Sequence, residues 1–257
     1  MLDKETLLNA HDHRHLKFEG ACNVRDLGGL PTAHGRMTRH GVLYRSDTLA
    51  HLSAADLERL SQLELRTVVD LRTAEECARA PDRLPLGATL TLHNPGFLPK
   101  GNEEMFASIN AGALDAQAAV AAMLVQYRSL TLEHLAEYRV FVSALLAPSR
   151  TPLLFHCASG KDRTGIAAAI VLLAVGVQRP WVVQDYVISN YQRRTVDLFV
   201  RAGPSPAVEQ VMAADPRYIE VAMTAMTEAF GSIDAYLEQG LGIDSAARRH
   251  LEKLLLD

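Results

Sequence analysis

A chain of 257 residues, of which 48% are hydrophobic, can bury a large core, and we expect a single α/β domain over residues 1–257. The formal net charge of −4 gives no general attraction for nucleic acid or anionic lipid, so any anion binding has to be local. Three cysteines favour a reducing compartment and the first residues lack a signal-peptide core, so we expect a cytoplasmic protein without membrane insertion, although export without a signal peptide would leave no mark.

Short apolar segments alternate with helical ones along the chain. Strands are predicted over residues 41–46, 66–71, 88–93 and 152–155. Helices are predicted over residues 53–63, 103–147 with a break near 129–131, 164–177, and in several segments of 181–257. This alternation is typical of a mainly parallel central sheet flanked by helices, in which ligands bind at the carboxyl ends of strands.

The last predicted strand leads directly into HCASGKDRTG, residues 156–165. A strand that ends in a tight turn and opens a helix directs successive backbone N–H groups at one point, beside the positive end of the helix dipole. Small residues let the backbone curl around an anion there, and the guanidinium of Arg163 can bind two phosphate oxygens. We therefore predict phosphate binding by Ala158, Ser159, Gly160, Lys161, Asp162, Arg163 and Thr164.

Cys157 is placed at the mouth of this predicted site, where the same field favours the thiolate form of a cysteine. A thiolate can attack phosphorus at neutral pH, and the hydroxyl of Thr164 can donate to the sulfur when it leaves. The spacing Cys-x5-Arg is weakly specific, since Cys77 and Arg83 repeat it. That copy follows a helical segment and contains a proline, which lacks an N–H donor, so we expect Cys77 to be a packed residue.

The loop resembles the active-site loop of cysteine-dependent protein tyrosine phosphatases. Its GKDRTG form is similar to the atypical bacterial tyrosine/serine phosphatases, which include secreted mycobacterial and listerial enzymes acting on phosphoproteins and phosphoinositides. Other segments that carry the resemblance are residues 23–29, 43–47, 69–72, 75–76, 81–82, 185–186, 189–190 and 236–237.

This resemblance implies the roles of individual residues. Cys157 would be the nucleophile and Arg163 the phosphate clamp, and the enzyme would need neither a metal nor an organic cofactor. Phosphorylated proteins and phosphoinositides would be the substrates. The resemblance also suggests that the segment from about Gln184 to Tyr218 forms helices over the mouth of the active site.

The general acid that protonates the leaving oxygen is predicted within the loop. Many tyrosine phosphatases carry this acid on a Trp-Pro-Asp loop upstream, but the single tryptophan here, Trp181, follows the cysteine. Asp162 is therefore the leading candidate, although it could instead orient the loop arginine or cap the next helix. Asp70, at the end of a predicted strand, is the alternative candidate, and a salt bridge with Arg72 or Arg45 is its structural interpretation.

Two further residues near the loop have alternative interpretations. Lys161 adds a mobile charge beside Arg163, and we predict that it lets the pocket accept an inositol ring with a second phosphate. A solvent-facing side chain that only raises the local potential is the other interpretation of Lys161. Cys22 is expected to be a packed thiol, with a protective disulfide to Cys157 as the alternative.

The sequence as a whole predicts hydrolysis of phosphate monoesters through a phosphocysteine intermediate. A rhodanese-like sulfurtransferase is one alternative, because it also uses a cysteine loop at a strand end. A phosphate-binding protein without catalysis is the other. The run Asp162-Arg163-Thr164 favours phosphate over sulfur transfer, and the complete set of loop residues favours catalysis.

Overall fold

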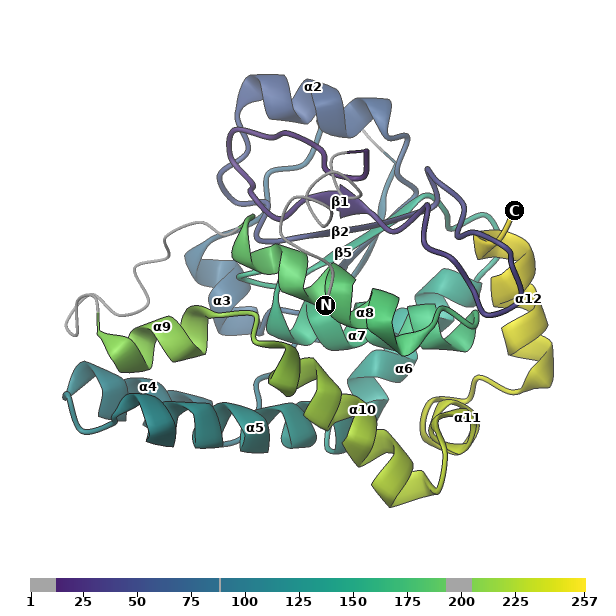
Figure 1. Cartoon of the computed structure of the whole chain (residues 1–257). Coiled ribbons are helices and arrows are strands. Elements are labelled where there is room, and N and C mark those ends of the chain that lie inside the picture. Colours follow the sequence, from purple (N-terminus) through teal and green to yellow (C-terminus); the bar gives the residue numbers. More distant parts are fainter. Residues whose placement is uncertain (1–12, 88, 193–204) are drawn as a thin grey trace.

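The computed structural model describes residues 13–87, 89–192 and 205–257, and its centre is a five-stranded sheet (Figure 1). In spatial order the strands are β1 (Arg25–Asp26), β2 (Leu43–Ser46), β5 (Leu153–His156), β3 (Thr67–Asp70) and β4 (Thr91–His93). Neighbouring strands pair in parallel, except that β1 runs antiparallel to β2. The expected mainly parallel sheet is confirmed, and β5 lies at its middle.

Helices connect the strands and form most of the second half of the chain. They are α2 (Ala54–Gln62), α3 (Ala74–Arg79), α4 (Asn102–Asn110), α5 (Ala116–Leu132), α6 (Leu135–Leu146), α7 (Asp162–Ala174), α8 (Arg179–Val187), α9 (Pro206–Met212), α10 (Pro216–Phe230), α11 (Ile233–Ala235) and α12 (Ser245–Leu255). A 3-10 turn, η1 (Ile188–Asn190), follows α8, and a π turn, η3 (Tyr236–Gly240), follows α11.

Several predicted boundaries differ from the structure, and the helix expected over 103–147 is also interrupted at 111–115, between α4 and α5. The strand expected over 88–93 begins at Thr91, and residue 88 itself lies outside the described residues. The break expected near 129–131 lies slightly later, at residues 133–134, because α5 continues to Leu132 and α6 begins at Leu135. Thr131 remains in the helix with its hydroxyl satisfied, since Oγ1 donates to the carbonyl of Tyr127 one turn earlier, at 2.7 Å.

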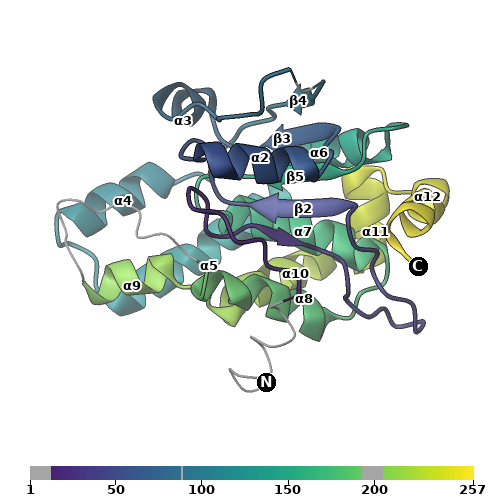
Figure 2. The same ribbon diagram turned by 90° about the horizontal axis from the view of Figure 1, so that it is seen from above.

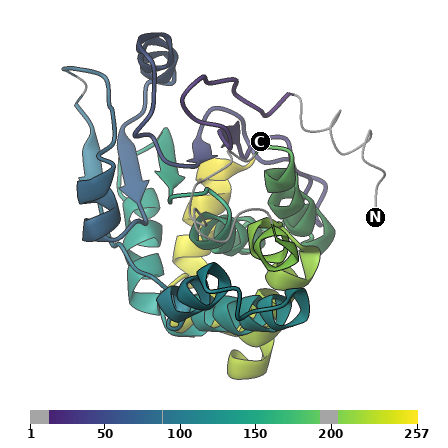
Figure 3. The ribbon, with the colours of Figure 1, turned by 90° about the vertical axis from the view of Figure 1, so that its left-hand side faces the viewer.

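The sheet buries a different set of side chains on each face. Along β5, Leu153 and Phe155 belong to one apolar cluster and Leu154 to the other, as the alternation of a strand requires. Helix α2 covers the smaller cluster, and Figure 2 shows it lying over the sheet. Figure 1 and Figure 3 place the longer helices on the opposite face. Both faces are therefore covered by helices, as the predicted α/β class requires.

The C-terminal helices build outward from the larger face. Helix α10 packs against α5, and α9 also packs against α5 beside the end of the sheet (Figure 1). Residues 193–204 of the segment expected to cover the active site lie outside the described residues. Within the described part of the chain, none of the helices combines the length and the apolar character needed to cross a membrane.

Candidate active site

The loop between β5 and α7 turns its carbonyl groups away from its own centre. The carbonyl of Ala158 accepts from the backbone N–H of Thr48 at 3.1 Å, and that of Gly160 accepts from Arg45 Nη2 at 2.7 Å and Asn23 Nδ2 at 3.0 Å. The backbone N–H groups of residues 158–161 have no acceptor in the described part of the chain. Unpaired N–H groups around a turn form a site for an anion.

Gly160 is required by both the turn and the neighbouring strand. Its φ of +64° lies in the left-handed region that favours glycine. A Cβ atom at this position would lie 2.6 Å from the backbone nitrogen of Asp47 and 2.6 Å from the carbonyl oxygen of Ser46. A larger residue would therefore push the loop away from the end of β2.

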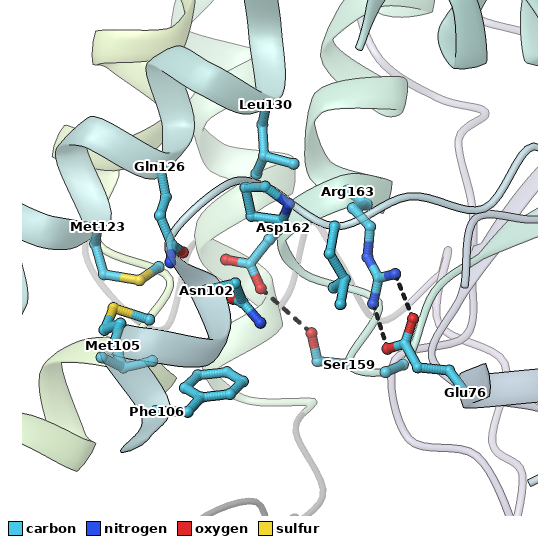
Figure 4. Close-up of a pocket in the computed structure, with 14 residues that line it drawn as sticks. Glu76, Asn102, Met105, Phe106, Met123, Gln126, Leu130, Ser159, Asp162 and Arg163 are labelled. Carbon is cyan, nitrogen blue, oxygen red and sulfur yellow. Dashed lines mark hydrogen bonds and ion pairs between the residues drawn. The ribbon is translucent and has the colours of Figure 1, made fainter. Parts of the chain in front are cut away.

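Arg163 is held on one side and open on the other. Nη1 donates to the carbonyls of Leu71 at 3.0 Å and Phe97 at 2.9 Å, and Nη1 and Nη2 each donate to Glu76 at 2.7 Å (Figure 4). The Nε–H and the second Nη2 hydrogen have no acceptor among the described residues, and these two donors lie on one edge of the guanidinium. That edge can bind two oxygens of a phosphate.

Glu76 is a site residue for which the sequence predicts no role, although positions 75–76 belong to the segments that carry the resemblance. It lies in the first turn of α3, where its backbone N–H is capped by Thr73. Burial alone would raise the pKa of Glu76, but the hydrogen bonds and charge of Arg163 outweigh burial and lower it. Because a buried arginine needs a carboxylate partner, the sequence implies that some Asp or Glu pairs with Arg163, but it does not identify which one.

Cys157 follows β5 directly and is 1% exposed, at the base of the loop. Thr164 is also buried, and its hydroxyl has no hydrogen-bond partner among the described residues. The three cysteines are free thiols, and the backbone N–H of Cys22 donates to the carboxylate of Asp47. The base of the loop therefore contains two of the predicted site residues, the thiol of Cys157 and the unpaired hydroxyl of Thr164.

Asp162 points into a pocket next to the loop, as Figure 4 shows. Helix α7 begins at this residue, but no side chain caps its N-terminus, so Asp162 is not used as a cap. Tyr127 donates to Oδ1 at 2.6 Å, whereas Oδ2 is 3.5 Å from the hydroxyl of Ser159. The carboxyl group is therefore held in place beside the open edge of Arg163.

Asp70 is placed differently, in a charged cluster behind the loop. Arg72 donates to both of its oxygens and, through Nη2, to Asp82 at 2.7 Å. Asp70 does not appear among the residues that line the described pocket. The salt bridge with Arg72 that the sequence left open is thus observed, and the geometry favours Asp162 over Asp70 as the acid.

Asp70, Asp82 and His156 place three ligand-type atoms within 4.8 Å of one another. His156 Nε2 lies 3.0 Å from Asp82, and burial, which alone would lower the pKa of His156, is outweighed by Asp82 and Asp70, so the pKa is raised. Metal binding needs a neutral histidine and free carboxylates. Because Arg72 already pairs with both carboxylates, the geometry fits an ion-pair network better than a metal centre.

Lys161 is buried instead of facing solvent. Its Nζ donates to two backbone carbonyls, that of Val211 in α9 and that of Ala213 just after this helix. The same Nζ lies 3.3 Å from Asp162 Oδ1. The solvent-facing interpretation is therefore wrong. The predicted contact with a second phosphate would require this ammonium to leave the carbonyls of the α9 segment, and it stays a prediction.

A buried cluster of ion pairs contacts the loop through Arg45. Asp185 of α8 pairs with Arg14 and Arg25 at 3.0 Å and with Arg45 at 2.6 Å. Arg45 in turn donates to the carbonyl of Gly160, so the cluster is linked directly to the loop. Arg25 and Arg45, which lie in two of the segments that carry the resemblance, are thus held in buried ion pairs.

We expect Asp185→Asn to lower the free energy of unfolding by about 3–5 kcal/mol, because it leaves three buried arginines without a carboxylate. Urea unfolding at neutral pH measures this. Burial alone would raise the pKa of Asp185, but the arginines outweigh it and hold the pKa well below its usual range. The contribution is therefore present above about pH 4, and it is lost as the pH falls through the folded-state pKa.

Asp234→Asn is the matched control, since Asp234 is 77% exposed at its side chain and pairs only with Arg248 in the described structure. An exposed pair contributes about 0–1 kcal/mol. Equal effects of the two substitutions would show that the Asp185 cluster does not stabilise the fold in the way described.

The pocket in front of the loop has an apolar wall and a polar floor. Helices α4 and α5 supply Met105, Phe106, Met123 and Leu130, while Ser159, Asp162 and Arg163 come from the loop side (Figure 4). Val211 of α9 also lines it, so one helix of the expected covering segment does reach the site. The contributions of α4 and α5 were not predicted.

Comparison with known proteins places the chain among phosphatases. A family model described as the tyrosine phosphatase family matches residues 16–257. A Cupriavidus necator protein assigned as a tyrosine-protein phosphatase is 34% identical over 257 aligned positions, covering 92% of this chain and 88% of that protein. The triple specificity protein phosphatase PtpB of Mycobacterium tuberculosis is 31% identical over 281 positions, covering 93% and 98%. The solved structure of TpbA from P. aeruginosa aligns with a TM-score of 0.32 and 17% identity, covering 73% of this chain and 90% of that chain.

Proposed function

The chain belongs to the tyrosine phosphatase family and hydrolyses phosphate monoesters, and on that premise we propose that Cys157 attacks the phosphorus of a phosphotyrosine side chain. Arg163 and the backbone N–H groups of residues 158–161 bind the non-bridging oxygens. Asp162 protonates the leaving oxygen. Membership of this family disfavours the sulfurtransferase alternative.

The observation that carries the proposal is the set of donors left unused around Cys157. The loop N–H groups and one edge of Arg163 have no acceptor among the described residues, while the neighbouring carbonyls and the other edge of Arg163 are bonded. A phosphate would accept from all of these donors at once. The phosphorus would then lie next to the sulfur of Cys157.

The first chemical step transfers the phosphoryl group to sulfur. The thiolate of Cys157 forms a bond to phosphorus as the bond between phosphorus and the phenolic oxygen breaks, and Asp162 gives its proton to that oxygen. The growing negative charge stays on oxygens that face Arg163 and the loop N–H groups.

The second step releases phosphate. Water attacks the phosphocysteine, Asp162 accepts a proton from that water, and the sulfur leaves as a thiolate with inorganic phosphate as the product. The buried hydroxyl of Thr164 has no partner in the described structure, which supports its assignment as a donor to the departing sulfur.

The walls of the pocket favour an aromatic phosphate ester. Met105, Phe106, Met123 and Leu130 offer apolar contact for a phenyl ring beside the loop. Arg163 is the cation among the described lining residues, since the ammonium of Lys161 is bonded to α9 carbonyls. A second phosphate would therefore meet the carboxyl groups of Glu76 and Asp162, so we rank phosphoinositides below phosphotyrosine. Phosphoserine and phosphothreonine have no ring to contact the apolar wall, so we also rank them below phosphotyrosine.

Phosphate release from a phosphotyrosine peptide, a phosphoserine peptide and a phosphoinositide, each with EDTA and no added metal, tests the function. We expect the highest kcat/KM for the phosphotyrosine peptide and no effect of EDTA. A strict requirement for a divalent ion, or no release from the phosphotyrosine peptide, would contradict the assignment.

We further propose that residues 1–257 act as one phosphatase domain in the cytoplasm. In support, one apolar cluster extends from Leu27 to Leu256 and joins the sheet to the C-terminal helices. The free state of the three cysteines fits a reducing compartment.

A further inference from the structure

Three tyrosines from three helices pack together, and one of them, Tyr127, contacts Asp162. Tyr127 of α5 is fully buried, and its ring lies 5.9 Å from that of Tyr186 on α8 and 5.5 Å from that of Tyr218 on α10. Its hydroxyl donates to Asp162 Oδ1 at 2.6 Å and is 2.5 Å from the hydroxyl of Tyr186. These rings hold the Tyr127 hydroxyl against the carboxyl group.

The direction of these hydrogen bonds follows from the number of protons. A phenol has one proton, and Tyr127 donates its proton to Asp162, so Tyr127 must accept from Tyr186. Burial, followed by the charge of Asp162, raises the pKa of Tyr127 well above its usual range, so the phenol keeps its proton throughout the working pH range.

The two oxygens of Asp162 therefore differ. Oδ1 accepts from Tyr127 and lies 3.3 Å from the ammonium of Lys161, and both contacts favour an unprotonated Oδ1. Among the described residues, Oδ2 has only the distant hydroxyl of Ser159, at 3.5 Å, and Figure 4 shows the carboxyl group directed into the pocket. The acidic proton belongs on Oδ2.

We propose that Tyr127 is a positioning residue, which fixes Oδ1 of Asp162 so that Oδ2 delivers the proton to the leaving oxygen. This rests on the proposed role of Asp162 as general acid. Without the Tyr127 hydroxyl the carboxyl group can rotate, and the proton is no longer held toward the leaving group. Loss of alignment at a reacting atom reduces a rate by up to about 100-fold.

Tyr127→Phe removes the hydroxyl and keeps the ring. We expect kcat for phenyl phosphate to fall by about 10-fold and kcat for p-nitrophenyl phosphate to fall far less, because an activated leaving group needs little protonation. Vanadate affinity should stay unchanged. In an Asp162→Asn background, Tyr127→Phe should have no further effect on phenyl phosphate.

Tyr236→Phe is the matched control, since Tyr236 is also buried and donates to α5, at the carbonyl of Thr131, without touching Asp162. Tyr236→Phe should lower kcat for both substrates by the same factor or leave both unchanged. An equal loss on both substrates in Tyr127→Phe, or a full additional loss in the Asp162→Asn background, would overturn the positioning role.

The single variant Asp162→Asn separates this failure from a failure of the proposed function. If Asp162→Asn shows a leaving-group dependence and Tyr127→Phe does not, only the role of Tyr127 is wrong. If Asp162→Asn itself slows both substrates equally, the assignment of the acid is wrong, and the role of Tyr127 is overturned with it.

Discussion

Cys157→Ser is expected to abolish phosphate release, by more than about 10⁴-fold, while the protein still binds vanadate. A serine hydroxyl is a weak nucleophile without an adjacent base, and of the two carboxylates in the described pocket, Glu76 pairs with Arg163, while we propose that Asp162 acts on the leaving oxygen. The donors for the anion are backbone N–H groups and Arg163, which the substitution does not change. Steady-state phosphate release and vanadate titration by calorimetry measure the two effects separately.

Cys77→Ser is the control for that experiment. Cys77 has the same spacing to Arg83 as Cys157 has to Arg163, yet it lies in α3 and donates to Asp70 at 3.1 Å. Serine can make the same hydrogen bond, and the pKa of Cys77 is raised to about 11, chiefly by burial, so this thiol is not a nucleophile at neutral pH. A wild-type rate in Cys157→Ser, or a complete loss in Cys77→Ser, would reverse the assignment.

The fold could be predicted where the signal is local. Short β-branched or apolar runs identified β2, β3 and β5, and the helix predicted from residue 53 corresponds to α2, which Ser53 and Asp56 start with a capping box. Strand β1 was missed because it contains only two residues and depends on pairing with β2. The helix break predicted near 129–131 lies at 133–134 instead, since α5 buries Ser129 and Thr131, and Thr131 satisfies its hydroxyl within the helix.

The residues of the candidate site also differ in how far the sequence could predict them. Cys157, Asp162 and Arg163 lie in one continuous stretch, so their proximity needs no knowledge of the fold. Glu76 is 87 positions from Arg163 and Tyr127 is 35 positions from Asp162, and only the packing of α3 and α5 brings them to the loop. The resemblance included positions 75–76 but did not indicate a contact with Arg163, and no local pattern distinguishes Tyr127 from an ordinary helix residue.

The second large effect is expected from Asp162→Asn, which preserves the shape of the side chain but cannot transfer a proton. General acid catalysis contributes about 10²–10⁴-fold, so kcat for phenyl phosphate should fall within that range. The loss should be much smaller for p-nitrophenyl phosphate, whose leaving group needs less protonation. A series of aryl phosphates with leaving groups of graded acidity, assayed at constant pH, measures this dependence.

A structural role for Asp162 makes a different prediction for the same series. If the carboxylate served mainly to hold Tyr127 and Lys161, which contact Oδ1, its replacement would disturb the loop equally for every substrate. All members of the series would then slow by one common factor, and vanadate affinity would fall with them. A steeper dependence on leaving-group acidity with unchanged vanadate affinity is what proton transfer from Oδ2 requires, because binding of the oxyanion involves Arg163 and the loop N–H groups and not this carboxyl group.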